Sequence, residues 1–372
     1  MRNSFIKENS IWPVSGNHYK TNDIHMKKLT PEEFLKEAIH IPVIDVRSPA
    51  EFEEGHIPGA INIALFNNDE RAVVGTLYKK TGKEAAVLKG LEIVGPKMAD
   101  FAKQAKEAAV QGKLLVHCWR GGMRSESMAW LFEKVGIQCA LLEGGYKAYR
   151  NYLLEQMVIT DNLVVIEGHT GGGKTEILKH LATMNEQVID LEGLACHRGS
   201  AFGGIGQGTQ PSTQQFQNNM LQQLLTFRRD RPIWVEGESK SIGRVFLPDP
   251  FWLSMNTATV LEIVVPAGDR IQRLVEDYAS LDAECMEQSI LKLKKRLGQT
   301  RMQEVLDFFR NKDYAKVAEL LLVYYDKTYQ YSTDKYKGTH ELMQLPSGDA
   351  RENAGILLDK LKSLELHANA CV

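Results

Sequence analysis

A cysteine in a short glycine-rich loop is the first residue that could carry chemistry. Residues 116–125 read VHCWRGGMRS, in which Cys118 and Arg124 flank five residues. The two glycines let the backbone curl around the sulfur, and a helix beginning at the end of the loop would direct its positive N-terminus toward it. Together with two arginines, this arrangement stabilises a thiolate and any anion that approaches it. We therefore expect Cys118 to be a nucleophile.

The rest of this loop is expected to bind the anion. The residues concerned are Trp119, Arg120, Gly121, Gly122, Met123, Arg124 and Ser125. The Cys-x5-Arg spacing alone fits a phosphatase as well as a sulfur carrier. The other four cysteines (Cys139, Cys196, Cys285 and Cys371) are scattered and form no CxxC pair, so we expect inert thiols and neither a disulfide framework nor a zinc ribbon.

A second glycine loop has the form G-x4-G-K-[ST]. It lies between an apolar strand at 163–168 and an expected helix at 176–184, which is the context that a phosphate-binding P-loop needs. The expected phosphate-binding residues are Gly168, His169, Thr170, Gly171, Gly172, Gly173, Lys174 and Thr175. Their backbone N–H groups and the lysine would surround a phosphate, and the threonine could reach Mg²⁺.

An NTPase also needs an acidic group for Mg²⁺, usually an aspartate at a strand end. The candidates are Asp190, Glu236 and Glu238, but the usual aspartate is absent. No water-positioning residue or arginine finger stands out, so the sequence favours diphosphate binding over NTP hydrolysis. Arg198 and Ser200, in the glycine-rich stretch 197–206, are further substrate candidates on an expected mobile loop near the phosphate.

Alternating strands and helices must position these loops, which indicates an α/β fold with parallel sheets. Strands are predicted at 41–47, 113–117, 137–142, 163–168, 187–191, 232–236 and 259–265, and helices at 99–111, 125–135, 270–310 and on to about 331. We divide the chain into a lead-in at 1–28, a first domain at 29–150 and a second at 151–372.

Charge and hydropathy exclude some classes of protein. The 45 basic and 47 acidic residues give a net charge of −2, which argues against a uniformly basic nucleic-acid binder but not against a local patch. Residues 1–150 carry 21 basic and 18 acidic side chains (+3), and the remainder carries 24 and 29 (−5). No apolar run approaches the roughly 18 residues of a membrane span, and no signal peptide is visible, so we expect a cytoplasmic protein without a membrane partner.

The segment upstream of the cysteine loop decides between phosphatase and sulfur carrier. Residues 45–62, DVRSPAEFEEGHIPGAIN, together with the cysteine loop, resemble the rhodanese signature over about residues 29–150. The resemblance implies a persulfide-like or selenium-bearing intermediate on Cys118. Asp45 and Arg47 would lie near the loop as accessory residues, or would form a purely structural ion pair. Residues 67–97 exceed what a minimal rhodanese domain needs, and no motif gives them a role.

The order of the two loops narrows the resemblance further. With the segments LEGGYK at 142–147, EGHTGGGKTE at 167–176 and HRGSAFG at 197–203, the chain resembles the bacterial tRNA 2-selenouridine synthase family over about residues 29–365. This implies a rhodanese-like parallel-sheet domain, then a P-loop NTPase-like α/β domain with a helical C-terminal region.

The resemblance also implies a reaction. Members of this family convert wobble 2-thiouridine in tRNA to 2-selenouridine: geranyl diphosphate alkylates the sulfur, and selenium from selenophosphate then replaces the S-geranyl group. The co-substrates would be selenophosphate and geranyl diphosphate, with Mg²⁺ as an optional ion. The partners would be tRNA and a selenophosphate-producing enzyme as donor. Two alternatives stay open, namely an ATP-dependent sulfurtransferase acting on RNA and a nucleotide-binding regulatory module.

Three groups of side chains could contact tRNA. They are a basic cluster (Lys292, Lys294, Lys295, Arg296 and Arg301), a second one (Arg228, Arg229 and Arg231) and an aromatic group (Tyr324, Tyr325, Tyr329 and Tyr331). Charged runs are usually solvated helix faces, and aromatic groups usually pack in cores, so each group alone is a weak signal.

Overall fold

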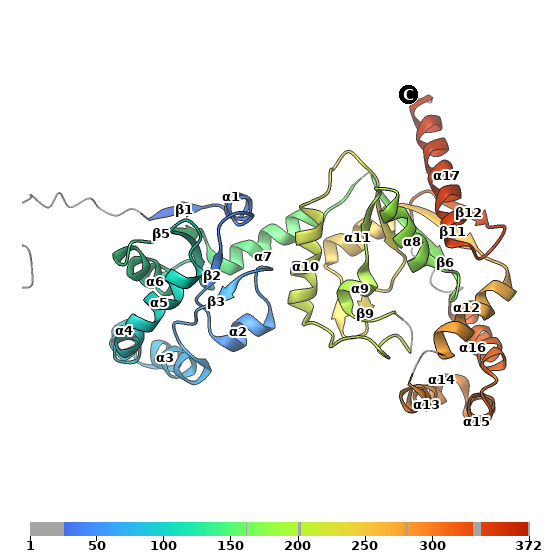
Figure 1. Cartoon of the computed structure of the whole chain (residues 1–372), viewed down its shortest axis with the longest axis horizontal. Coiled ribbons are helices and arrows are strands. Elements are labelled where there is room, and N and C mark those ends of the chain that lie inside the picture. Colours follow the sequence, from blue (N-terminus) through green and yellow to red (C-terminus); the bar gives the residue numbers. More distant parts are fainter. Residues whose placement is uncertain (1–25, 161, 200–201, 280–281, 330–335, 371–372) are drawn as a thin grey trace, which may run out of the picture.

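The computed structural model describes residues 26–160, 162–199, 202–279, 282–329 and 336–370 (Figure 1). Two five-stranded sheets organise these residues, and every pairing within each sheet is parallel. A small antiparallel pair, β9 (Ser241–Ile242) with β10 (Val245–Phe246), stands apart from them. Within the described ranges, no helix combines the length and the apolar character that crossing a membrane requires.

The first sheet has the strand order β1-β5-β4-β2-β3. Its side chains alternate between two cores, because helices cover both faces. Leu115 and Leu142 face the core under α1 and α7, whereas Val116 and Leu141 face the core under α5 and α6. The strands are β1 (Lys27–Leu29), β2 (Val43–Asp45), β3 (Ile61–Asn62), β4 (Lys113–His117) and β5 (Gln138–Leu142), and the helices are α1 (Pro31–Glu37), α2 (Pro49–Glu54), α5 (Met98–Ala108), α6 (Met123–Lys134) and α7 (Gly145–Gln156).

Two helices extend this domain between β3 and α5. They are α3 (Asn68–Lys80) and α4 (Lys83–Val94), followed by the short 3-10 turn Gly95–Lys97. Asn67 caps α3 in a capping box with Glu70, and Gly82 turns the chain back with φ +110°. The pair therefore forms a helical hairpin, which accounts for the excess length at 67–97.

The second sheet has the order β12-β11-β6-β8-β7, with β6 at its centre. It too alternates between two cores: Val165 and Val235 face α10 and α11, while Ile166 and Trp234 face α8 and α17. The strands are β6 (Leu163–Gly168), β7 (Gln187–Ile189), β8 (Ile233–Glu236), β11 (Thr259–Val264) and β12 (His340–Gln344), and the helices are α8 (Lys174–Thr183), α9 (Leu191–Ala195), α10 (Thr213–Leu224), α11 (Asp249–Thr257) and α17 (Ala350–Ala370).

Five consecutive helices follow β11 and pack around their own core. They are α12 (Ala267–Ala279), α13 (Ala283–Lys292), α14 (Lys294–Leu297), α15 (Gln299–Arg310) and α16 (Tyr314–Tyr329). Met286, Val305 and Leu321 are fully buried in that core. This agrees with the helical region that the sequence predicts after residue 270.

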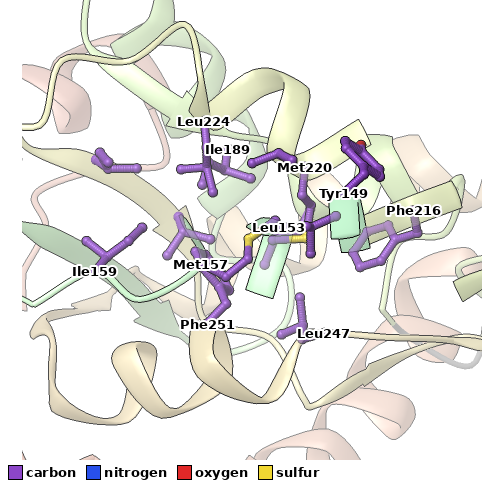
Figure 2. Close-up of a cluster of buried hydrophobic side chains, with 14 of the residues drawn as sticks. Tyr149, Leu153, Met157, Ile159, Ile189, Phe216, Met220, Leu224, Leu247 and Phe251 are labelled. Atoms are coloured by element: carbon purple, nitrogen blue, oxygen red, sulfur yellow. The ribbon is translucent and has the colours of Figure 1, made fainter. Parts of the chain in front are cut away.

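Helix α7 joins the two sheets into one continuous core (Figure 2). Its side chains Tyr149, Leu153 and Met157 pack with Met220 of α10 and Phe251 of α11. The same contact also carries polar bonds, because the Asn218 side-chain amide donates to His56 O at 2.7 Å and to the Tyr146 hydroxyl at 2.8 Å. The two sheets are thus joined by shared buried apolar surface and not only by the connecting chain.

Several elements differ from the sequence-based expectations. Strand β1 begins at Lys27, inside the stretch 1–28 taken as a lead-in, and pairs with β5. A three-residue edge strand is too short to show a hydrophobic period. The hairpin α3–α4, the strand β12 and the helix α17 were also not predicted. Residues 1–25 lie outside the described part of the chain.

Candidate functional site

The cysteine loop connects the carboxyl end of β4 to the start of α6. Cys118 directly follows β4 and is almost fully buried. The Ser125 hydroxyl lies 3.2 Å from Cys118 Sγ and 3.0 Å from Gly122 O. Helix α6 begins at Met123, so its positive end faces the loop. A hydroxyl and a helix N-terminus therefore lie beside one sulfur.

Two glycines of the next loop hold the cysteine loop in place. Gly145 has φ +63°, and a Cβ there would clash with Gly121 N and Cys118 O. Because no side chain intervenes, the first N–H groups of α7 reach across: Tyr146 N donates to Cys118 O and Lys147 N to Trp119 O, both at 2.9 Å. In the sequence this GGYK segment contributed only to the family resemblance, so its supporting role is a finding of the structure.

The two loop arginines lie in different surroundings. Arg120 is exposed and lines the cavity in front of Cys118. Arg124 lines the same cavity and is held by Glu51, whose Oε2 accepts from Arg124 Nη1 at 2.8 Å and lies 3.5 Å from Arg71 Nε. Three guanidinium groups therefore surround the entrance to the sulfur, which suits a small anion.

The other predicted loop residues divide between the cavity and the core. Trp119, Gly122 and Met123 line the cavity, although Trp119 also packs against Tyr146, 5.8 Å between ring centres. Gly121 faces the α7 loop instead of the cavity. Most of the residues predicted to bind the anion thus line one cavity, and Gly121 supports the backbone beside it.

Asp45 and Arg47 form a buried ion pair beneath the loop. Arg47 Nη2 donates to Asp45 Oδ2 at 2.6 Å and to Gly55 O at 2.7 Å, and the guanidinium stacks on the Tyr146 ring at 3.8 Å. Neither side chain lines the cavity in front of Cys118. Of the two roles that the sequence left open, the structure supports the structural one.

The P-loop connects β6 to α8 as its motif predicts. Lys174 Nζ donates to Gly168 O at 2.8 Å and lies 3.6 Å from Glu236 Oε1. Gly171 and Gly173 have φ near +78° and +79°, a conformation that glycine adopts at no steric cost. Thr170 to Thr175 line a cavity of about 370 Å³, whereas His169 turns away and its Nδ1 contacts Asp326 at 2.9 Å.

Three carboxylates gather beside the P-loop. Oxygen atoms of Glu192, Glu236 and Glu238 lie within 4.8 Å of one another, and the Thr175 hydroxyl is 3.2 Å from Glu192 and 2.9 Å from Glu236. Burial and mutual repulsion raise the pKa of Glu192 to about 9 and that of Glu238 to about 8. Burial likewise raises the pKa of Glu236.

Burial shifts the pKa of the neighbouring Lys174 in the opposite direction, and nearby carboxylates reverse that shift. Burial alone would lower the pKa of Lys174, but Glu236, Glu167 and Glu238 raise it above its ordinary value. Lys174 therefore stays charged inside an acidic pocket. Once Glu192 and Glu238 lose their protons, one ammonium no longer neutralises the three carboxylates, and a hard cation with oxygen ligands such as Mg²⁺ fits them.

Asp190 was wrongly placed among the metal candidates. Its carboxylate caps α9 by accepting from Gly193 N at 2.8 Å, and it does not line the phosphate cavity. Glu192, two residues later, points there instead. A strand followed by Asp-x-Glu was the available signal, but the sequence does not tell which carboxylate is used as the helix cap.

Arginines reach the phosphate cavity from two directions. Arg198 lies 3.4 Å from Asp277, and Arg273 donates to Gly171 O at 2.7 Å and to Gly348 O at 2.6 Å, over the glycines of the P-loop. Arg273 was not among the predicted site residues, because it lies in a helix, α12, that carries no motif. Ser200 lies outside the described residues.

The stretch 197–206 was expected to be a polar loop, but part of it packs in an apolar core. Phe202 is buried against Tyr278, with ring centres 5.6 Å apart, and belongs to the core of the C-terminal helices. Phe202, Leu274, Tyr278 and Tyr325 add apolar and aromatic lining to the phosphate cavity.

The three groups of residues predicted to contact tRNA lie in different surroundings. Lys292, Lys294, Lys295 and Arg296 are exposed around α13 and α14. In the second basic cluster, Arg228 pairs with Asp230, Arg229 bonds Gln156 and Arg231 lies 3.5 Å from Glu186, so those charges are engaged locally. Tyr325 lines the phosphate cavity, and Tyr331 lies outside the described residues.

Comparison with known proteins matches both domains. Residues 30–152 match the rhodanese-like domain, and residues 161–357 match the tRNA 2-selenouridine synthase AAA domain. Proteins named tRNA 2-selenouridine synthase include one from Bdellovibrio bacteriovorus, 35% identical over 84% of this chain and 96% of its own length. Another, from Shewanella sediminis, is 34% identical over 81% and 92%.

Among solved structures, the N-terminal domain of a Clostridium difficile 630 protein titled as ATP/GTP-binding is 40% identical over 35% of this chain and 98% of its own, with a TM-score of 0.31. The identity and coverage of the full-length relatives, together with the match over residues 161–357, decide the assignment. The chain therefore belongs to the tRNA 2-selenouridine synthase family.

Proposed function

We propose that the protein replaces sulfur by selenium in wobble 2-thiouridine of tRNA, in two steps at two sites. The observation that carries this proposal is the presence, in one chain, of a cysteine loop and a P-loop, each with its own cavity. A sulfurtransferase of the rhodanese kind needs only the first site. The second site is accounted for if the sulfur must first be made a leaving group.

The P-loop cavity suits the alkylation step. The thio sulfur attacks C1 of geranyl diphosphate, an S–C bond forms, and pyrophosphate leaves. Lys174, Arg273 and the loop N–H groups would stabilise the departing charge, while Phe202, Leu274 and Tyr278 offer apolar contact for the prenyl chain. Glu192, Glu236 and Glu238 with Thr175 would hold Mg²⁺, which when bound neutralises the diphosphate.

The cysteine loop suits the selenium step. Arg120, Arg124 and loop N–H groups would bind selenophosphate, supplied by a selenophosphate-producing enzyme, against Cys118. Selenium then displaces the geranylthio group from C2 of the base, geranylthiol leaves, and water takes up the phosphoryl group as phosphate. Cys118 would hold the selenium of the bound selenophosphate against C2 through contact with its sulfur, without a Cys–Se bond, because this selenium is already at the selenide level and an S–Se bond would need an oxidant.

The exposed basic residues around α13 and α14 are the proposed contact for tRNA phosphates. They lie on the helical region that follows the P-loop sheet, away from both loops in sequence. Binding there would add affinity without reading the wobble base itself.

The test is mass spectrometry of tRNA nucleosides after incubation with geranyl diphosphate, selenophosphate and Mg²⁺. The wild type should form 2-selenouridine, and Cys118→Ser should stop at S-geranyl-2-thiouridine. If Cys118→Ser, folded and binding tRNA, loses both products, the division between sites is refuted. If tRNA-stimulated ATP hydrolysis appears and no selenium is gained, an ATP-dependent sulfurtransferase is the better description.

A further inference from the structure

A large cavity opens directly in front of Cys118, and the helical hairpin α3–α4 forms its outer wall. Its volume is about 920 Å³, inside the range of roughly 300–1,000 Å³ typical of pockets that enclose small ligands. The cysteine loop forms one end of the cavity. A minimal cysteine loop needs no such wall, so the hairpin calls for a function of its own.

The hairpin and the segment before it line this cavity with apolar side chains, some of which stay exposed. Residues from α3, α4 and the preceding segment contribute, namely Phe66, Val74, Tyr78, Val87, Leu91 and Val94. Tyr78 and Leu91 remain 59% and 63% exposed. Large apolar side chains gathered on one concave surface typically bind an apolar ligand.

Charged side chains line the same cavity. Arg71, on α3 itself, and Arg120 and Arg124 of the cysteine loop lie there with Cys118. Its ligand must therefore combine a small anionic or polar reacting end, placed at the sulfur, with an apolar body. Selenophosphate alone would leave the apolar lining unoccupied.

We propose that this pocket binds the prenyl chain of the S-geranyl nucleoside during the selenium step, an inference that rests on the proposed function. The C2 atom of the base would then lie at the cysteine loop, with the ten-carbon chain along α3 and α4. When the C2–Se bond forms and the C2–S bond breaks, the departing geranylthiol is already seated in an apolar site. The chain is thus a recognition element as well as part of the leaving group.

The pocket is matched to this occupant by the chemistry of both ends. Each methylene group moved from water into an apolar site is worth roughly fourfold in affinity. A prenyl group therefore gives strong discrimination between alkylated and unalkylated thiouridine. The wobble base would enter the cysteine site only after the alkylation step.

The test compares two leucines of α4 in the full-length protein. Leu91 lines the pocket, whereas Leu88, 58% exposed on the same helix, does not. Leu91→Gln places an amide where the chain should lie, and Leu88→Gln makes the same substitution outside it. The probe is the nucleoside S-geranyl-2-thiouridine, with 2-thiouridine as reference, measured by isothermal titration calorimetry.

We expect wild type and Leu88→Gln to bind the geranylated nucleoside at least tenfold more tightly than 2-thiouridine. Leu91→Gln should weaken its binding roughly tenfold and leave 2-thiouridine unchanged, since a buried amide without a partner is costly. Equal binding by the two variants overturns the proposal, as does wild-type binding without preference for the prenyl chain.

Selenation of pre-geranylated tRNA by the wild type tests the proposed function separately. If the nucleoside binds through Leu91 but no selenium is incorporated, the subsite stands and the proposed reaction fails. If selenium is incorporated equally into S-methyl and S-geranyl substrates, and Leu91→Gln matches Leu88→Gln, the reaction stands and the subsite fails.

Discussion

The carboxylate cluster beside the P-loop should make Mg²⁺ binding strongly dependent on pH. With pKa values of about 9 for Glu192 and about 8 for Glu238, both groups hold protons at pH 7. A cation must displace those protons to bind. Each displaced proton makes the apparent affinity rise about tenfold per pH unit, so we expect at least a tenfold gain between pH 6.5 and 7.5 and a plateau above about pH 9.

The same protons affect folding. These carboxyl pKa values are raised above the value of 4.5 expected in the unfolded chain, so the folded protein binds protons that the unfolded chain has already released. Without metal, the free energy of unfolding should therefore fall as pH rises from about 5 toward 9, by about 1.4 kcal/mol per pH unit for each proton held. Mg²⁺ should offset this loss most at pH 8 to 9.

Calorimetric titration of MgCl₂ in two buffers of different ionisation enthalpy measures affinity and proton release together. Thermal unfolding from pH 6 to 9, with EDTA and with Mg²⁺, measures the stability effect. Glu236→Gln should weaken Mg²⁺ binding at least roughly tenfold and flatten both profiles. Asp190→Asn is the matched control, because asparagine still caps α9 and the residue lies outside the cluster. Affinity that does not change with pH, or equal effects of the two variants, would refute the reasoning.

Three further predictions concern the cysteine loop and tRNA. Ser125→Ala removes the hydroxyl 3.2 Å from Cys118 Sγ, and should slow alkylation of Cys118 by iodoacetamide roughly tenfold at pH 7 without unfolding the protein. Gly145→Ala forces a Cβ against Gly121 N and Cys118 O, and should lower the free energy of unfolding by about 1–3 kcal/mol in chemical denaturation. Charge reversal at Lys294 and Lys295 should weaken tRNA binding. In filter-binding titrations, the slope of log affinity against log salt concentration should fall by about two, because about two fewer counterions are released.

Each of these predictions has a matched comparison. Ala at Gly95 meets no atom within 4 Å and φ there is −48°, so Gly95→Ala should leave stability nearly unchanged. Lys103→Glu reverses an exposed charge on α5, outside the basic cluster, and should affect tRNA binding less than reversal of either cluster lysine. Alkylation of Cys118→Ser gives the background from the other thiols. Equal effects of the two glycine variants, or of the cluster and control lysine variants, would contradict the corresponding prediction. So would alkylation of Ser125→Ala at the wild-type rate once that background is subtracted.

The sequence predicted those parts of the sites that one short segment builds alone. A strand, a glycine turn and a helix N-terminus follow one another around Cys118 and again around Lys174. In each case one short run of consecutive residues determines the local geometry. The parallel sheets followed from β-branched apolar runs. Family resemblance then linked the two loops.

Residues supplied by other elements were missed for a common reason. Glu192, Arg273 and Gly145 reach the sites only because strand order and helix packing bring separate segments together. Asp190 was a candidate because an aspartate at a strand end is the usual metal ligand, and Glu192 was not considered, but the Asp190 side chain caps α9. Spacing along the chain contains no information that separates these two uses.

The hairpin α3–α4 escaped prediction for a reason that bears on its function. A helix is recognised in a sequence by a stripe of apolar residues that the protein itself covers. No residue of α3 is buried, and α4 buries only Ala86 and Gly90, so the apolar side chains here are only partly covered by the rest of the protein. An apolar helix face that stays partly exposed beside a reactive sulfur is expected if a bound ligand covers that face. The weak helical signal at 67–97 and the apolar cavity at Cys118 thus have one explanation, which the comparison of Leu91 with Leu88 tests directly.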